Sequence, residues 1–229
     1  MVNVKILKKP EDVLKEKPKK IINVIISVYD GVEYIEECLD SIQAQTLQPD
    51  AILLGIDGCQ KTLKKVKQIR DKYDNLYVYY SSKNVGVYKM FNSLIDLVPE
   101  DEYIQIFGAD DIMYPDMLEK MSSQGKHTIS RHVGILFIQK KEIERVGGFR
   151  GWRCGADADM IYRLRLLYKY REVILSLLFH RRVHDKQLTK VYPATKGLRK
   201  KYYKITQDNY KSDKPIIYIK PIKTKLREI

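Results

Sequence analysis

An almost unbroken run of apolar and β-branched residues at positions 21–29 constrains the fold more than any other part of the chain. Such continuity is typical of a strand buried on both faces of a parallel sheet. The turn Asp30-Gly31 follows, and residues 33–44 then place apolar side chains at helical spacing with charges on the opposite side. The first unit of the chain is therefore predicted to be strand, turn and helix.

The same alternation continues downstream. Strands are expected at residues 51–56 and 76–80, with a helix over 62–72 between them, which gives a βαβαβ unit. The pattern predicts an α/β fold with a Rossmann-like nucleotide-binding half, whose mostly parallel central sheet is flanked by helices. Further elements are expected as a helix starting at 84–86, a strand at 103–107, helices at 114–122 and 140–146, a strand at 133–138, a helix at 156–170 and a strand at 175–179.

Composition narrows the class of protein. Hydrophobic residues make up 44% of the 229 positions and charged residues 31%, which is typical of a globular chain. There is no run of about 18 apolar residues, and the N-terminus lacks the apolar core of a signal peptide. The three cysteines, Cys38, Cys59 and Cys154, have no metal-ligand spacing and are interpreted as reduced thiols of a cytoplasmic protein.

Positive charge is concentrated at the two ends of the chain. Residues 1–20 hold 7 basic and 3 acidic residues, and residues 181–229 hold 15 and 4, while the middle is nearly neutral. Basic ends on a neutral core favour weak, peripheral contact with an anionic membrane through the C-terminal segment, or simple solubility. Nucleic acid is disfavoured as a partner, because no nucleic-acid-binding motif is present.

Two adjacent carboxylates, Asp110 and Asp111, follow the predicted strand at 103–107. Paired carboxylates repel unless a positive group lies between them, and loops at strand ends are where α/β folds bind ligands. A hard divalent cation that bridges to phosphate would satisfy both side chains. The alternative is that Asp111 caps the following helix while Asp110 is solvated.

The order of these elements and motifs resembles the family-2 glycosyltransferases of the GT-A fold over about residues 21–190. The resemblance implies a nucleotide-diphosphate sugar donor, with a UDP-sugar as the expected form, an Mn²⁺ or Mg²⁺ ion, inversion at the anomeric centre and a saccharide, lipid-linked or protein acceptor. It is carried by six ordered landmarks: IISVYDGVEYIEECLDSI, the strand-end IDG, NVGVYKMFN, GADD, VGGFRGW followed by GADADMIYRL, and RRVHDKQLT.

The resemblance also implies site residues for the donor nucleotide. Tyr29 would pack against the base while the backbone from Ser27 lines its pocket, with core packing as the alternative for Tyr29. Asp57 matches the carboxylate that accepts a hydrogen bond from the base, although an Asp-Gly turn is also common. Gly86 allows close approach of the backbone. Trp152 is expected either to stack on a sugar or to fill the core.

For the metal, the resemblance implies Asp110 and Asp111 as ligands, with His184 completing the metal or diphosphate site. His184 lies in the family's spacing to Arg182 and Thr189. The family often carries a further acid at the position of Gly108, where it contacts the ribose, and this chain departs from that pattern.

For catalysis, the resemblance implies Asp157 as the general base that takes a proton from the acceptor hydroxyl. The family usually has Glu-Asp where this chain has Ala156-Asp157. Asp159 competes for the role, but two residues along a helix turn a side chain by about 200°, so both carboxylates cannot face the cleft equally. Both acids could instead stabilise the helix N-terminus.

The predicted domain organisation is a basic segment at 1–20, a GT-A domain at 21–190 and a basic extension at 191–229. The predicted function is transfer of a sugar from the nucleotide donor to a hydroxyl acceptor in polysaccharide or glycoconjugate synthesis. A catalytically inactive nucleotide- or carbohydrate-binding protein of the same fold is the first alternative, because Gly108 and Ala156 replace acids. A nucleotidyltransferase is the second, although its usual glycine-rich, basic phosphate loop is not found.

Overall fold

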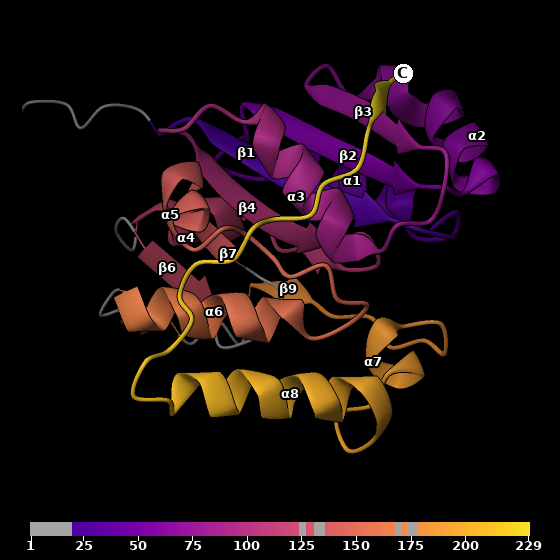
Figure 1. Cartoon of the computed structure of the whole chain (residues 1–229). Helices are drawn as coiled ribbons and strands as arrows, with labels where there is room; N and C mark the ends of the chain where they lie inside the picture. Colours follow the sequence, from indigo (N-terminus) through magenta and orange to yellow (C-terminus); the bar gives the residue numbers. More distant parts are fainter. Residues whose placement is uncertain (1–19, 124–126, 131–135, 168–170, 174–177) are drawn as a thin grey trace, which may run out of the picture.

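A computed structural model of the chain describes residues 20–123, 127–130, 136–167, 171–173 and 178–229. One eight-stranded sheet, in the order β10-β3-β2-β1-β4-β7-β6-β8, forms its centre (Figure 1). The strands are β1 (Ile22–Val28), β2 (Ala51–Asp57), β3 (Leu76–Ser81), β4 (Tyr103–Gly108), β6 (His127–Ser130), β7 (Leu136–Gln139), β8 (Arg171–Val173) and β10 (Arg227–Glu228), while β5 (Ile112–Met113) pairs with β9 (Phe179–His180).

The four strands β3, β2, β1 and β4 are parallel neighbours, as the βαβαβ pattern predicts. Strand β7 is antiparallel to both β4 and β6, and β10 is antiparallel to β3. Strand β1 is paired along both edges, with β2 and β4, and helices cover both of its faces. Val24 and Ile26 pack towards one cluster of buried residues and Ile25 towards the other, and all three are fully buried. This burial explains the unbroken apolar run.

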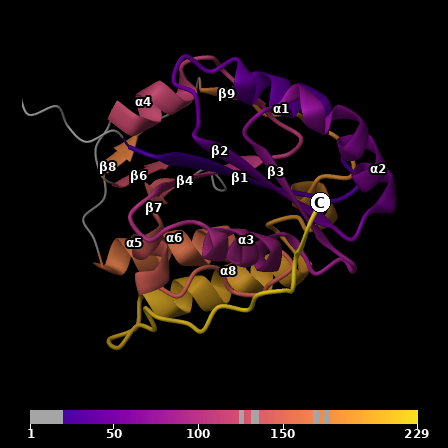
Figure 2. The same cartoon turned by 90° about the horizontal axis from the view of Figure 1, so that it is seen from above.

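Helices cover both faces of the sheet (Figure 2). Helices α1, α2 and α4 lie on one face, and α3, α5 and α6 on the other, with α8 packed outside α6. The bounds are α1 (Ile35–Gln43), α2 (Gln60–Ile69), α3 (Val87–Leu97), α4 (Met117–Ser123), α5 (Lys140–Arg145), α6 (Ala156–Leu167), α7 (Leu188–Val191) and α8 (Gly197–Tyr210). Within the described ranges, no helix combines the length and apolar character needed to cross a bilayer.

The elements expected from the sequence agree with the observed ones up to β4, within a few residues at their ends. Helix α4 begins at Met117, three residues later than predicted, after a turn that contains Pro115. Parts of three later predictions lie outside the described residues, namely 133–135 of one strand, 168–170 of one helix and 175–177 of another strand. The predicted basic segment 1–20 lies outside them too, except for Lys20.

Residues 215–229, here called the C-terminal strap, run from α8 back across α3 to the edge of the sheet (Figure 1). The backbone N–H of Ile219 donates to the carbonyl of Val146 at 3.3 Å, and Asn92 donates to the carbonyl of Ile222 at 3.1 Å. Beyond these contacts β10 adds to the free edge of β3. The basic C-terminal segment is therefore packed against the α/β domain along most of its length.

Candidate active site

The carboxyl ends of the parallel strands meet at one edge of the sheet, where ligands bind in folds of this type. Strand β1 ends before Tyr29, β2 ends at Asp57 and β4 ends at Gly108. In the register of the sheet, Ser27 lies between Gly55 and Gly108. The ring of Tyr29, which follows β1, has a relative exposure of 60%. Core packing, the alternative for Tyr29, is thus excluded.

Asp57 organises the loop between β3 and α3. Its two carboxylate oxygens accept hydrogen bonds from the backbone N–H groups of Val85 at 2.7 Å and Gly86 at 2.8 Å. Burial raises the pKa of Asp57, whereas these two hydrogen bonds and the nearby Arg153 oppose that rise. Gly86 has φ +93°, a left-handed conformation that glycine adopts at little cost. Asp57 and Gly86 are therefore brought into direct contact.

Asp110 and His184 meet at the end of β4 although they are far apart in the sequence. His184 Nε2 lies 3.0 Å from Asp110 Oδ2. The side chain of His184 is 19% exposed and that of Asp110 is 32% exposed. Asp111 turns towards the same loop, where its Oδ1 accepts the N–H of Arg182 at 3.1 Å. This bond means that Asp111 holds the loop that carries His184, and it does not act as the cap of α4.

Burial, and then the neighbouring Asp110 carboxylate, raise the pKa of Asp111 to about 7. A raised pKa of this origin means that burial and the Asp110 charge both disfavour the ionised form of Asp111. Gly108 creates room for the pair, because a Cβ added there would lie 2.8 Å from Asp111 Oδ2 and 3.1 Å from Asp110 Oδ1. The glycine that replaces the family's acid therefore belongs to this arrangement of the two carboxylates.

The loop at residues 181–187 lies over the start of α1. The ring of His184 stacks on Tyr34 with ring centres 4.8 Å apart, and Lys186 pairs with Asp30 at 3.0 Å. Arg182 forms an ion pair with Glu37. These contacts hold His184 in place beside Asp110, so the pair is preorganised.

Asp157 lies in the first turn of α6 and is half-buried. Its Oδ1 accepts a hydrogen bond from the hydroxyl of Tyr88 at 3.0 Å and another from the N–H of Ala158 at 2.9 Å. Burial raises its pKa, and the two hydrogen bonds partly oppose this rise. A carboxylate with a raised pKa and no ion pair among the described residues is suited to accept a proton.

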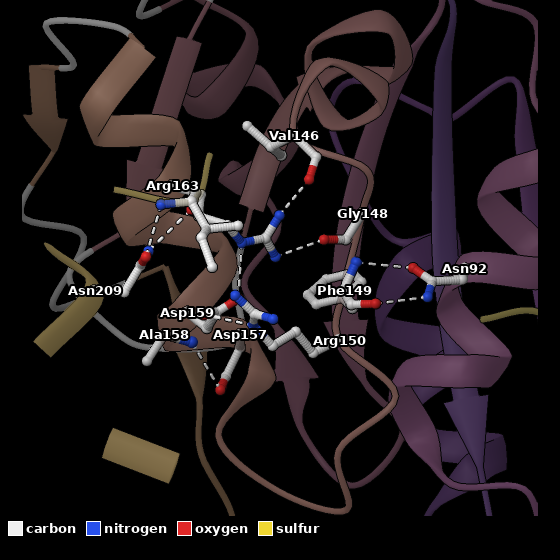
Figure 3. Close-up of polar contacts among 11 residues, drawn as sticks. Asn92, Val146, Gly148, Phe149, Arg150, Asp157, Ala158, Asp159, Arg163 and Asn209 are labelled. Carbon is white, nitrogen blue, oxygen red and sulfur yellow. Dashed lines mark hydrogen bonds and ion pairs between the residues drawn. The ribbon is translucent and has the colours of Figure 1, made fainter. Parts of the chain in front are cut away.

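Asp159 has a different environment, which Figure 3 shows. It is 1% exposed and accepts hydrogen bonds from Arg150 at 2.9 Å and from Arg163 at 2.7 Å. Arg163 is itself fully buried and also donates to the carbonyls of Val146 and Gly148. Asp159 therefore joins α6 to the glycine turn before it, and its two oxygens are occupied by arginines.

Trp152 lies flat against Tyr202 of α8, with ring centres 4.3 Å apart and planes inclined by 6°. The guanidinium of Arg150 lies 5.3 Å from the indole centre. The indole thus has a structural partner, and it is half-buried rather than enclosed in the core. Sugar stacking by Trp152 stays a prediction.

One functional candidate, Tyr88, was not identified from the sequence. Tyr88 accepts the N–H of Gly155 at 3.1 Å while its own hydroxyl donates to Asp157, so it fixes the start of α6 from α3. In the sequence it has the same apolar spacing as a core residue of α3, and nothing else distinguishes it. Among the described residues no hydrogen bond or ion pair links Asp157 directly to Asp110 and His184. The site therefore has two separate parts, here called the metal corner (Asp110 and His184) and the base corner (Asp157 and Tyr88).

Comparisons with known proteins agree with this geometry. Residues 23–124 match the family described as glycosyl transferase family 2. The glycosyltransferase GlyG of Streptococcus pneumoniae is 28% identical over 105 residues, and the amylovoran biosynthesis glycosyltransferase AmsE of Erwinia amylovora is 30% identical over 106. These matches cover 46% and 44% of this chain, and only 35% and 39% of those relatives. The chain thus matches well under half the length of either one.

Solved structures extend the likeness beyond the matched segment. TarS of S. aureus, in complex with UDP-GlcNAc, superposes with a TM-score of 0.66 over 85% of this chain and 68% of that one, at 14% identity. The mannosyltransferase PcManGT from Pyrobaculum calidifontis, in complex with GDP-Man and Mn²⁺, superposes with a TM-score of 0.58 over 69% of this chain and 55% of that one, at 17% identity. The chain has the GT-A fold, and its residues 23–124 are similar to glycosyl transferase family 2.

Proposed function

We propose that this chain transfers a sugar from a nucleotide-diphosphate sugar to a hydroxyl group of an acceptor, with inversion at the anomeric carbon. The observation that carries the proposal is the contrast between two acids on α6. Asp159 is held by two arginines, whereas the donors to Asp157 within the described ranges are a tyrosine hydroxyl and a backbone N–H. Similarity to glycosyl transferase family 2 supplies the reaction class in which such a base is needed.

The residues at the end of β4 fit a divalent cation. Asp110 and His184 would hold the ion, because their Oδ2 and Nε2 atoms lie 3.0 Å apart at the end of β4 and both can be metal ligands. No ready cluster of three acidic, histidine or cysteine ligands exists in the described part of the chain. The donor diphosphate and water would therefore complete the shell, as is usual for Mg²⁺.

When bound, the cation would neutralise the charge on the departing diphosphate. The protein groups perform the remaining steps. Tyr29 and Asp57 would orient the nucleotide, with uracil as the expected base and Ser27 and Gly86 lining its pocket. Asp157 would accept the proton of the acceptor hydroxyl while the hydroxyl oxygen forms its bond to the anomeric carbon. The bond from that carbon to the diphosphate oxygen breaks, and the nucleotide diphosphate leaves with the electron pair.

The acceptor is proposed to be a saccharide or glycoconjugate. The similarity to AmsE, an amylovoran biosynthesis glycosyltransferase, favours a polysaccharide product. The TarS complex with UDP-GlcNAc favours a UDP-sugar, whereas the PcManGT complex with GDP-Man shows that the fold also accepts a guanine nucleotide. A screen of UDP- and GDP-sugars for thermal stabilisation, with and without Mn²⁺, would identify the donor.

The metal corner is tested by binding. Asp110→Asn should weaken Mn²⁺-dependent binding of UDP by about tenfold or more in calorimetric titration, because a charged ligand becomes neutral. Asp116→Asn is the matched control, since Asp116 is an exposed acid that pairs with Lys120. Equal UDP affinity in Asp110→Asn and in the control would move the metal site elsewhere.

The base is tested by separating binding from turnover. Asp157→Asn should retain donor and metal affinity yet reduce transfer by roughly 10² to 10⁴, the usual contribution of a positioned general base. Asp208→Asn, at an exposed position on α8, is the matched control. Full transfer by Asp157→Asn would exclude Asp157 as the base. Wild-type protein that binds the donor but neither transfers nor hydrolyses it would support the catalytically inactive alternative.

A further inference from the structure

Helix α8 lies outside the segment that matches the family, yet it places a charged side chain behind the proposed base. Figure 1 shows α8 running alongside α6. Arg199, in the first turn of α8, keeps only 8% of its exposure. An arginine is almost never buried to this extent unless a partner compensates its charge.

The hydrogen bonds of Arg199 do not provide that compensation. Its Nη2 donates to the carbonyl of Leu188 at 3.3 Å, and its buried Nε has no hydrogen-bond partner. Within the described ranges, no carboxylate lies within the 4.0 Å that defines an ion pair with its guanidinium. The positive charge must therefore be balanced over a slightly longer distance.

The stem of Arg199 shows where that balance comes from. A Cβ added at Gly155 would lie 3.9 Å from Arg199 Cγ, so the stem passes over the residue that precedes α6. The N–H of Gly155 donates to Tyr88, and the hydroxyl of Tyr88 donates to Asp157. Arg199 is thus packed against the short chain of contacts that ends at the carboxylate.

The groups that face Asp157 come from three directions. Tyr88 approaches from α3, Cys154 lies just before α6, and Arg199 approaches from α8. Burial raises the pKa of both Tyr88 and Cys154, so both are neutral at neutral pH. Burial raises the pKa of Asp157, and Arg199 is the charged side chain that opposes this rise.

We propose that Arg199 is a positioning residue that acts as the buried counter-ion of Asp157, keeping the carboxylate ionised and fixing the start of α6. This role rests on the proposed function only in that it makes Asp157 the base. The bond from Arg199 to Leu188 also ties α8 to α7, a few residues after His184. Arg199 thereby connects the base corner of the site with the chain that carries the metal corner.

The test measures the ionisation of Asp157 directly. Protein labelled with ¹³C at aspartate carboxyl groups would be titrated by NMR, with Asp157→Asn used to assign the signal. Arg199→Met removes the charge and keeps much of the stem, and Arg199→Gln keeps an N–H donor for the carbonyl of Leu188. A nearby opposite charge lowers a carboxyl pKa by about 1 to 3 units. Both variants should therefore raise the pKa of Asp157 by about 1 unit or more.

Two further variants serve as controls. Arg199→Lys retains the charge and should keep the pKa of Asp157 close to that of the wild type. Lys200→Met removes an exposed charge from the neighbouring position and should leave that pKa unchanged. In transfer assays, the acidic limb of the pH profile of kcat should move upwards with the loss of Arg199, while the affinity for UDP with Mn²⁺ stays the same.

An unchanged pKa of Asp157 in folded Arg199→Met would overturn the proposal, and so would an equal rise in Lys200→Met. If Arg199→Met does not fold, Arg199→Gln decides the question. The NMR titration needs no turnover, so a wild-type protein without transfer activity would contradict the proposed function and leave the counter-ion test intact.

Discussion

The two acids of α6 should respond in opposite ways to the same substitution. Asp159→Asn removes one negative charge from a buried cluster in which Arg150 and Arg163 both bind the carboxylate (Figure 3). Arg163 and Asp159 are each about 1% exposed, so solvent cannot replace the lost charge. Breaking a buried ion pair by neutralising one partner costs about 3 to 5 kcal/mol. That cost is a large fraction of a typical stability of about 5 to 15 kcal/mol.

Asp157→Asn should leave the free energy of unfolding unchanged or raise it. Burial holds the pKa of Asp157 in the folded protein above its ordinary value of 3.8, so the folded state binds the proton more tightly than the unfolded chain does. Stability is then lost as pH rises from the unfolded pKa through the folded pKa. At neutral pH the ionised carboxylate therefore destabilises the fold even with Arg199 nearby, because burial outweighs the attraction to Arg199, and a neutral amide removes this cost.

The assay is urea unfolding at neutral pH, followed by circular dichroism. With a slope of about 1 to 3 kcal/mol per M, the midpoint of Asp159→Asn should fall by at least about 1 M, while that of Asp157→Asn should stay or rise. Equal losses in both variants would refute the division of roles between the two acids. A stable Asp159→Asn would show that the arginines find other partners and that the cluster does not hold the glycine turn.

Three further measurements follow from the structure. Transfer should fall as pH drops through the raised pKa of Asp157, because the base must be deprotonated, and a kcat that shows no acidic limb would contradict this. Gly147→Ala should increase hydrogen exchange in the C-terminal strap, because a Cβ at position 147 would lie 1.6 Å from the carbonyl oxygen of Ile219. Gly197→Ala is the control: Gly197 also has a positive φ, but a Cβ there would meet no atom within 4 Å, so exchange in the strap should not change. Co-sedimentation with anionic vesicles at low salt should show weak, salt-sensitive binding, because exposed apolar side chains of the strap alternate with lysines, and equal recovery without vesicles would exclude it.

Much of the α/β core could be predicted because it leaves a strong pattern in the sequence. Strands β1 and β4 are buried on both faces and are therefore continuously apolar, and helix α1 has one apolar side. Short edge elements leave little trace. Strand β10 is two residues long and exposed, and it exists only because the strap returns to β3. Its pairing is set by distant packing rather than by local preference.

Site residues at the ends of elements were predictable, whereas their partners were not. Asp57, Asp110 and Asp157 follow strands or begin a helix, which are positions that the sequence pattern defines. The contacts that give them their chemistry join residues far apart in the chain. His184 reaches Asp110 across 74 positions and Tyr88 reaches Asp157 across 69. Spacing alone cannot define such pairs.

Helix α8 is the largest element that the sequence reasoning missed, and its position changes how the C-terminal extension is understood. A run of basic residues at 199–201 obscured the helical pattern, because it favours a solvated segment. In the fold, Arg199 is buried while Lys200 is exposed, so adjacent charges have opposite environments. Tyr202 covers Trp152, and the strap closes against the glycine turn. All six sequence landmarks precede α8, yet Arg199 and Tyr202, which pack behind the start of α6, follow them. A fragment ending at residue 190 would therefore keep the landmarks and lose the packing behind the proposed base.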